Sequence, residues 1–365
     1  METLTRASDQ LFRRGPDECF ASFDDLWRHC QEDKARSIDR WHPPADVRLD
    51  HEGGRLALRL GGASGFRLND WSFSQLCSAA GISKDTVNKL SSTTASLVFA
   101  ETLPGGNKPL QLLTTSGEGV DVIRSVHGAA YTRLFDADLL SMVREFATDF
   151  QPPQEAGFAP GGESMAVSIE EGGASDRRGG TGLYRGEQDM FIFLIDPTGW
   201  TEIDGEAFAP GFFLWNSEVG KRSVGIQTFW FQAVCRNHIV WDAVEVVEFS
   251  RKHTANVHEA FGEIRGIVER LVTKRDERRD GFVKLIRRAM ETRLGADSDE
   301  VLKVLSQKGI TKALAKEALE AAKQSGRFTV FSLVDALTRI SGRMKFIGER
   351  TDADMKASAL LALAL

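Results

Sequence analysis

The segment from Ser223 to Val234, SVGIQTFWFQAV, restricts the fold of this chain more than any other. β-Branched and aromatic residues alternate along it with a period of two, which is the pattern of a β-strand. Ile226 and Trp230 would lie on one face of that strand, and Phe229 and Phe231 on the other. Because both faces carry bulky apolar side chains, we predict a central strand that is covered on both sides.

A β-hairpin is predicted at this strand. A short apolar run, Phe212 to Trp215, precedes it across a polar turn that contains Gly220. The tip of this hairpin would display Glu218, Lys221 and Arg222. These charged side chains would face either solvent or a ligand, and the residues themselves leave both interpretations open.

The chain as a whole predicts an α+β fold with a mixed or antiparallel central sheet and flanking helices. Residues 1–45 contain an amphipathic helical segment that ends at His-Pro-Pro. Residues 46–255 combine strand patterns with helices and form the predicted α+β core. Residues 256–365 form a predicted helical C-terminal region, which begins with one long amphipathic helical segment over 258–295.

Composition is that of a soluble globular protein, with 42% hydrophobic and 27% charged residues. The N-terminus has charges where a signal peptide needs an apolar stretch, and no apolar run approaches the ~20 residues of a membrane span. The cysteines are scattered without a CxxC pair, as expected for reduced thiols. We therefore expect a cytoplasmic protein without membrane contact.

The sequence contains no recognisable catalytic or cofactor motif. A GxxxxGK[ST] loop, a GxSxG elbow and an HExxH pair are all absent. His253 and His258 are five residues apart, which misses the spacing of four that places two ligands on one helical face. We therefore expect no metal and no cofactor. An enzyme that uses Cys235 as an activated thiol, with His238 and Glu218, is an alternative hypothesis.

Basic residues gather around and after the hairpin, although the chain has a formal net charge of −6. From Lys221 to Arg288 there are fourteen Lys and Arg residues against nine Asp and Glu residues. Cations near a groove can contact phosphates without fixed spacing, and aromatics beside them can stack unpaired bases. A solvated helical face would give the same count. The residues predicted to contact phosphates are Lys221, Arg222, Arg236, Arg251 and Lys252, and those predicted to line the same groove are Arg124, Tyr131 and Arg133.

Three stretches of the chain resemble motifs of a known family and occur in the same order as in that family. They are RSVHGAAYTRLFDADLLSMV, then PGFFLWNSEVGKRSVGIQTFWFQAVCRNHIVWD followed by SRKHT, then TVFSLVDALTRISG. Together they resemble the phage/plasmid-like proteins grouped as domain of unknown function 932. That family shows an NSE-x-G turn, a V-C-x-N element, a downstream R/K-H-T and an N-A-L-T-R helix. Asp335 stands where the family usually has Asn, and the Gly that often follows Asn237 is missing. The matching motif positions are Asn216, Ser217, Glu218, Gly220, Cys235, Asn237 and His253.

The resemblance covers roughly residues 65–345 and implies a protein of a phage, plasmid or integrated mobile element. The family has no settled activity, but its genes tend to accompany replication and recombination functions. We therefore expect a non-enzymatic DNA-binding protein, a single-strand binding or annealing factor that works as a homo-oligomer. An alternative from another class is a protein-interaction factor that modulates host defence or the replication machinery. The acidic net charge and the helical C-terminal region fit that alternative.

Overall fold

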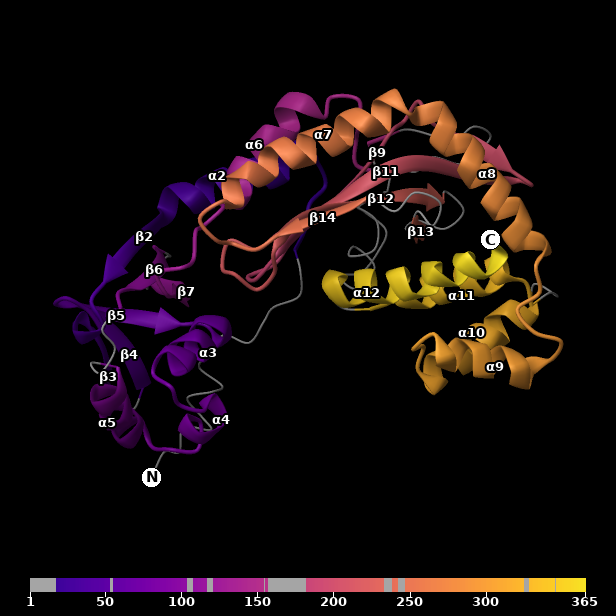
Figure 1. Ribbon diagram of the computed structural model, residues 1–365. Helices are drawn as coiled ribbons and strands as arrows, with labels where there is room; N and C mark the ends of the chain where they lie inside the picture. The colour runs from indigo at the N-terminus through magenta and orange to yellow at the C-terminus, as the bar shows by residue number, and fades with distance from the viewer. Residues whose placement is uncertain are drawn as a thin grey trace.

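The molecule is an arch built on two β-sheets that follow one another along its length (Figure 1). This computed structural model describes residues 18–52, 55–103, 108–116, 121–153, 155–156, 182–232, 238–241, 247–324, 328–344 and 346–365. Within these residues one sheet has six strands and the other has eight. The predicted α+β fold class is confirmed, and the range 46–255 contributes to both sheets rather than to one.

The six-stranded sheet forms the N-terminal end of the arch. Its elements are β2 (Ser37–His42), β3 (Val47–Glu52), β4 (Arg55–Leu60), β5 (Ala63–Leu68), β6 (Leu110–Thr115), β7 (Val122–His127), α3 (Asp70–Ala79), α4 (Lys84–Val87) and α5 (Ser92–Thr102). The strand order is β2-β6-β7-β5-β4-β3, and only β5 and β7 run parallel. Phe73 on α3 and Phe99 on α5 are fully buried against Leu58 and Leu112 of the sheet.

The eight-stranded sheet spans the middle of the arch. Its strands are β1 (Glu18–Cys19), β8 (Leu183–Arg185), β9 (Met190–Ile195), β10 (Thr201–Ile203), β11 (Glu206–Asn216), β12 (Val224–Gln232), β13 (His238–Trp241) and β14 (Glu248–Arg251). All pairs are antiparallel in the order β1-β8-β9-β11-β12-β13, with β10 on β11 and β14 on β12. Every residue of β12 is buried between these neighbours, which confirms the predicted central strand.

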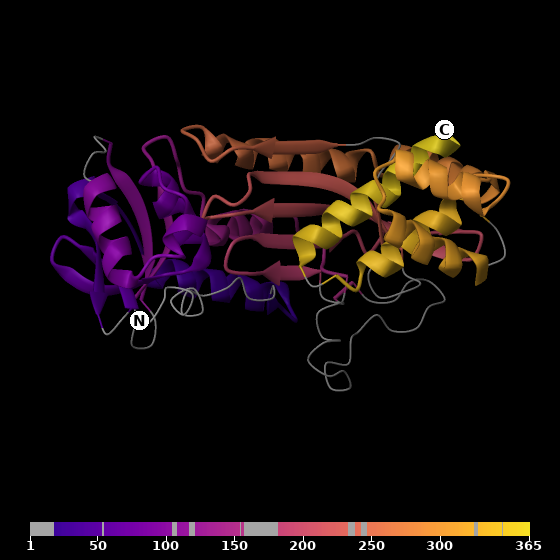
Figure 2. The same cartoon turned by 90° about the horizontal axis from the view of Figure 1, so that it is seen from below.

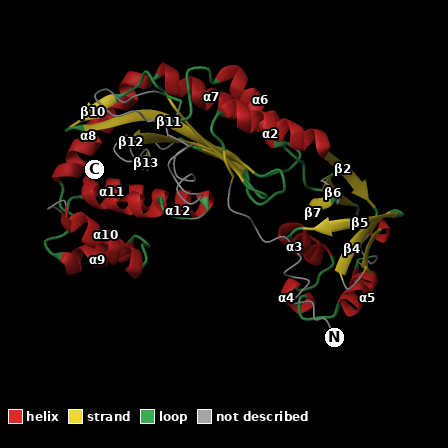
Figure 3. Ribbon diagram, turned by 180° about the vertical axis from the view of Figure 1, so that it is seen from behind, coloured by secondary structure: helices red, strands yellow, loops and turns green. Residues whose placement is uncertain are grey.

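Helices cover both faces of β12, as its residue pattern predicts. On one face, Ile226 belongs to the core formed with α2 (Phe23–Arg36), α6 (Asp136–Phe146) and α7 (Ala260–Thr273), which lie in a row over the outer surface of the arch (Figure 3).

Further along that face, Trp230 stacks on Phe282 of α8 (Arg275–Glu291) with ring centroids 4.1 Å apart. On the opposite face, Phe229 packs with Ile347 of α12 (Ile347–Ser358) beneath the sheet.

Two predicted helices have different limits in the structure. The N-terminal helix ends at Arg36, and the following residues form β2, because they pair with β6 instead of continuing to His-Pro-Pro. The long segment 258–295 is divided into α7 and α8 at Lys274, where the backbone leaves the helical region with a φ of −106°.

The helical C-terminal region is completed by α9 (Ser298–Gln307), α10 (Lys312–Gln324), α11 (Val330–Ser341) and α12. Viewed from below, α11 and α12 lie across the strands of the eight-stranded sheet (Figure 2). In the part of the chain that is described, no helix combines the length and the apolar character needed to cross a membrane.

Candidate functional site

The turn between β11 and β12 is docked against the N-terminal sheet and α3, so it is not the free hairpin tip that the sequence predicts. The Val219 carbonyl accepts hydrogen bonds from Trp71 Nε1 at 2.8 Å, from Gln75 Nε2 at 3.2 Å and from His127 Nε2 at 3.0 Å. Ser217 Oγ donates to the Gln188 carbonyl and accepts from the Lys221 backbone N–H at 2.8 Å. The turn therefore has a fixed shape and joins the two sheets.

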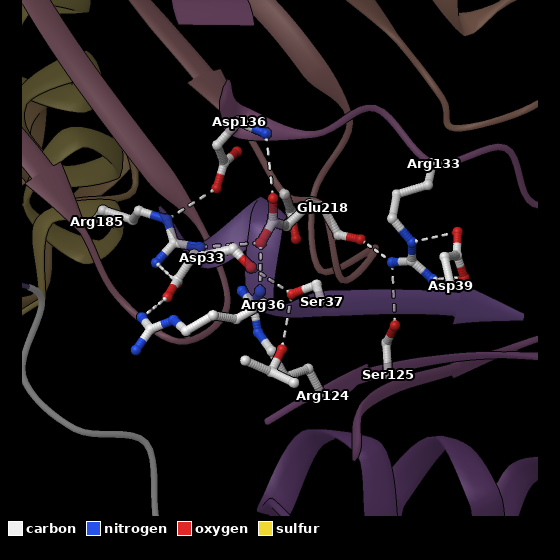
Figure 4. A network of polar contacts seen from close by, with 12 residues as sticks. Asp33, Arg36, Ser37, Asp39, Arg124, Ser125, Arg133, Asp136, Arg185 and Glu218 are labelled. Carbon is white, nitrogen blue, oxygen red and sulfur yellow. Dashed lines mark hydrogen bonds and ion pairs between the residues drawn. The ribbon is translucent and has the colours of Figure 1, made fainter. Parts of the chain in front are cut away.

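Glu218 is buried inside this junction, which corrects the prediction that its side chain is displayed (Figure 4). Its carboxylate lies 2.6 Å from the Arg124 guanidinium and 2.9 Å from that of Arg185, and it accepts from the Asp136 backbone N–H at 3.2 Å. Burial opposes ionisation of this carboxyl, but the two guanidiniums outweigh burial and lower the pKa of Glu218 to about 2. Glu218 is therefore a charged structural centre.

Asp136 occupies the same buried cluster with the opposite pKa shift. It accepts from Arg185 Nε at 3.2 Å and from Asn216 Nδ2 at 2.8 Å. Burial and the Glu218 charge raise the pKa of Asp136 to about 7. Arg185 also contacts Asp33 at 2.7 Å. We call Asp33, Arg124, Asp136, Arg185 and Glu218 the ion network.

In the ion network three carboxyl groups face two guanidiniums. Arg36 adds a third guanidinium, 2.7 Å from Asp33, so the raised pKa of Asp136 follows from its burial and from the Glu218 charge.

Arg124 and Arg133 do not line an open groove, contrary to the prediction. Arg133 is 6% exposed and bonds to Asp39 at 2.8 Å, to Ser125 Oγ at 3.1 Å and to the Glu218 carbonyl. Arg124 is held by Glu218 in the ion network. Both guanidiniums neutralise or bridge groups inside the junction, because they lie where the two sheets meet.

An open pocket of about 990 Å³ lies directly outside this junction, and we call it the basic pocket. Three segments that are distant in sequence line it: 128–131 after β7, 220–223 in the turn, and 252–254 after β14. Lys108 completes the lining and is a cation that sequence reasoning missed. The predicted residues that meet here are Tyr131, Gly220, Lys221, Arg222, Lys252 and His253.

The lining of the basic pocket contains four cations and no carboxylate among the residues described. Lys221 and Lys252 are exposed, and the Lys221 ammonium lies 4.6 Å from the centre of the Trp71 ring. Arg222 donates a hydrogen bond from its Nε to Asp189 at 3.1 Å, so only part of its guanidinium is available to a ligand. Arg251 lies outside the lining and pairs with Glu259 at 2.6 Å.

Tyr131 and His253 form the inner wall of the basic pocket, and His127 stacks on Tyr131 behind it. The ring centroids of His127 and Tyr131 are 3.6 Å apart and those of Tyr131 and His253 are 5.4 Å apart, with nearly parallel planes. Burial lowers the pKa of His127 to about 3 and that of His253 to about 4, so both rings are neutral near pH 7. Tyr131 Oη donates to the Glu218 carbonyl at 3.0 Å, which ties this wall to the ion network.

Gly220 allows the turn to approach these rings. Its φ of +76° lies in the left-handed region, and a Cβ there would overlap the His127 ring and come within 3.0 Å of Tyr131 Cε2. This steric limit explains why the NSE-x-G turn of this chain has glycine at position 220.

Several predicted residues lie outside the described part of the chain: Cys235, Arg236 and Asn237. His238 begins β13, but its side chain is not described. Over the residues that the structure covers, no group of three or more His, Cys, Asp or Glu side chains could hold a metal ion.

No protein-family model matches the chain, and neither the curated proteins nor the solved structures include a match.

Proposed function

We propose that this chain is a non-enzymatic single-stranded DNA-binding protein of a mobile element, and that the basic pocket contacts the phosphate backbone. The observation that carries the proposal is the charge of this pocket. Its described lining has four cations and no carboxylate, in a chain with a net charge of −6. Such local segregation of charge, rather than net charge, determines polyanion binding.

The availability of the lysines supports the same proposal. Lys108, Lys221 and Lys252 are exposed and form no ion pair with a described carboxylate. A cation without a carboxylate partner keeps its charge for a ligand, and release of counterions from the phosphates would favour association. Small residues at Gly128 and Ala129 leave room for a polymer backbone between these cations.

The proposal is tested by fluorescence anisotropy with a labelled oligo(dT) at several salt concentrations. We expect binding at low salt that weakens as salt increases. Lys221→Glu with Lys252→Glu should reduce affinity strongly and lower the salt slope by about 1.4, because single strands contribute roughly 0.7 per phosphate contact.

The matched control is Lys312→Glu with Lys316→Glu, which changes the net charge equally on exposed positions of α10. Equal losses in the two double variants would contradict a localised site. Absence of wild-type binding at low salt would exclude the function itself.

A second candidate, self-association or binding to another protein, is favoured by the edge strand β2. This strand ends the six-stranded sheet, and its Ile38 and Trp41 side chains are 44% and 47% exposed. Exposed apolar residues on a sheet edge are suited to pairing with another chain. We expect the wild type to show an oligomeric mass by light scattering and Trp41→Asp to show a monomeric mass. Leu97→Asp, on α5, is the control at another exposed apolar residue.

A further inference from the structure

A second cavity of about 560 Å³ adjoins the basic pocket, and the two share Lys108 and Gly128 as lining residues. We call it the tryptophan pocket, because the indole of Trp71 forms part of its wall. Its volume lies in the range of small-ligand pockets, roughly 300–1,000 Å³. The two cavities are therefore close enough for one continuous molecule to occupy both.

One face of α3 provides much of the wall. Trp71, Ser74, Gln75 and Ser78 all line the tryptophan pocket, at the spacing of three and four residues that places side chains on one helical face. The opposite face, represented by Phe73, is buried in the core of the N-terminal sheet. Helix α3 thus has one face buried in the hydrophobic core and another face that lines the tryptophan pocket.

The chemistry of this wall differs from that of the basic pocket. Leu103, Leu110 and Val126 supply apolar surface, the face of α3 adds uncharged hydroxyl and amide groups, and Lys108 is the lone cation of the described lining. Such a wall suits a flat, uncharged heterocycle better than a phosphate.

The aromatic wall is held in place before any ligand arrives. Trp71 Nε1 donates to the Val219 carbonyl at 2.8 Å, and Gln75 Oε1 accepts from the Val126 N–H at 3.0 Å. A wall with fixed side chains loses little conformational entropy when it binds a ligand. The Lys221 ammonium, 4.6 Å from the centre of the Trp71 ring, links this wall to the basic pocket.

We propose that the tryptophan pocket takes one unstacked nucleobase of the strand whose phosphates lie in the basic pocket. This inference rests on the proposed function and deepens it, because it assigns a contact to the base as well as to the backbone. Stacking on an aromatic side chain accepts every base, so the site would favour single strands without a strong sequence preference.

The test compares oligo(dT) with an oligomer of the same length and charge whose internal sugars carry no base. The wild type should bind oligo(dT) about tenfold or more tightly, given the usual contribution of one stacked base. Trp71→Leu should remove most of this difference and leave affinity for the abasic strand nearly unchanged. Trp71→Phe, which keeps a ring, should retain part of the preference.

Trp27→Leu on α2 is the control for loss of a partly buried tryptophan that lines neither cavity. If Trp71→Leu fails to fold, Ser78→Phe gives the same test, because it fills the cavity from an exposed helical position and leaves Trp71 in place. Equal wild-type affinity for the two strands, with normal salt dependence, would overturn the base site and leave the phosphate site intact. Binding to neither strand would instead overturn the proposed function.

Discussion

Arg124 on β7 of the six-stranded sheet forms an ion pair of 2.6 Å with Glu218 in the turn that joins β11 and β12 of the eight-stranded sheet. Both side chains are nearly excluded from solvent, with 12% and 5% of their surface exposed. Because the Glu218 carbonyl also accepts from Tyr131, the same residue supports the inner wall of the basic pocket. The shape of the pocket and the joint between the sheets therefore depend on one another.

Replacement of Glu218 by Gln should destabilise the protein strongly. It would leave the buried Arg124 and Arg185 guanidiniums with less compensating charge, and breaking a buried pair costs about 3–5 kcal/mol. The Glu259→Gln variant is the control, because its pair with Arg251 is largely exposed on the carboxylate side and should contribute less than about 1 kcal/mol. Urea unfolding followed by circular dichroism measures both. Similar midpoints for the two variants would refute the structural role of Glu218.

The effect of Glu218→Gln should also depend on pH. The pKa of Glu218 is lowered from 4.5 to about 2, so its stabilising contribution is present above pH 4.5 and is lost as the pH falls towards 2. The difference in unfolding free energy between wild type and variant should therefore be largest above pH 4.5 and shrink in acid. A difference that is constant from pH 6 to pH 3 would disprove this linkage.

Asp136 should give the opposite pH dependence. Its pKa is raised from 3.8 to about 7, so between these values the folded chain keeps a proton that the unfolded chain has released. The free energy of unfolding should then fall as the pH rises through this window, by at most about 1.4 kcal/mol per pH unit. Asp136→Asn removes this titration and should flatten the slope between pH 5 and pH 7, measured by urea midpoints.

The control for this slope is Asp138→Asn, two residues further along α6. Asp138 pairs with Lys34 at 2.5 Å, and its side chain is 37% exposed. This variant should keep the wild-type slope, whatever its effect on overall stability. If Asp136→Asn also keeps that slope, the buried proton is not located at Asp136.

Local patterns were sufficient to predict the central strand. In β12 the period of two and the bulky residues on both faces are properties of adjacent residues, so burial on both sides can be inferred without knowledge of its neighbours. The limit of α2 could not be inferred in this way. Residues 37–42 leave the helix because β6 is present to pair with them, and that partner is more than 60 residues away in the chain.

The ion network was beyond sequence reasoning for a related reason. The sequence predicts Arg124 as part of an open groove and assigns no role to Arg185, and only the docking of the β11–β12 turn places Glu218 between them. A hint was present in the polar Asn216-Ser217-Glu218 run directly after a buried strand. Sequence alone could not distinguish a buried polar centre from an exposed turn there, because both use the same residue types.

Gly220→Ala should be more destabilising than Gly205→Ala. Both glycines have positive φ, +76° and +87°, so both variants incur the left-handed backbone cost of about 1–2 kcal/mol. Only at Gly220 would the new Cβ also overlap a neighbour, the His127 ring, whereas nothing lies within 4 Å of a Cβ at Gly205. Thermal unfolding should show a larger decrease in melting temperature for Gly220→Ala than for Gly205→Ala. Equal decreases would show that the His127 and Tyr131 rings move aside at little energetic cost.

Lys108 provides a prediction that connects the two cavities. It lines both the basic pocket and the tryptophan pocket, so Lys108→Ala should weaken binding to oligo(dT) and to the abasic strand alike. The expected change in salt slope is about 0.7, the value for one phosphate contact on a single strand. Lys89→Ala is the matched control, because Lys89 is an exposed lysine of the same N-terminal part that lines neither cavity. A loss confined to oligo(dT) would place Lys108 beside the base rather than the backbone, and an effect equal to that of Lys89→Ala would remove it from the site.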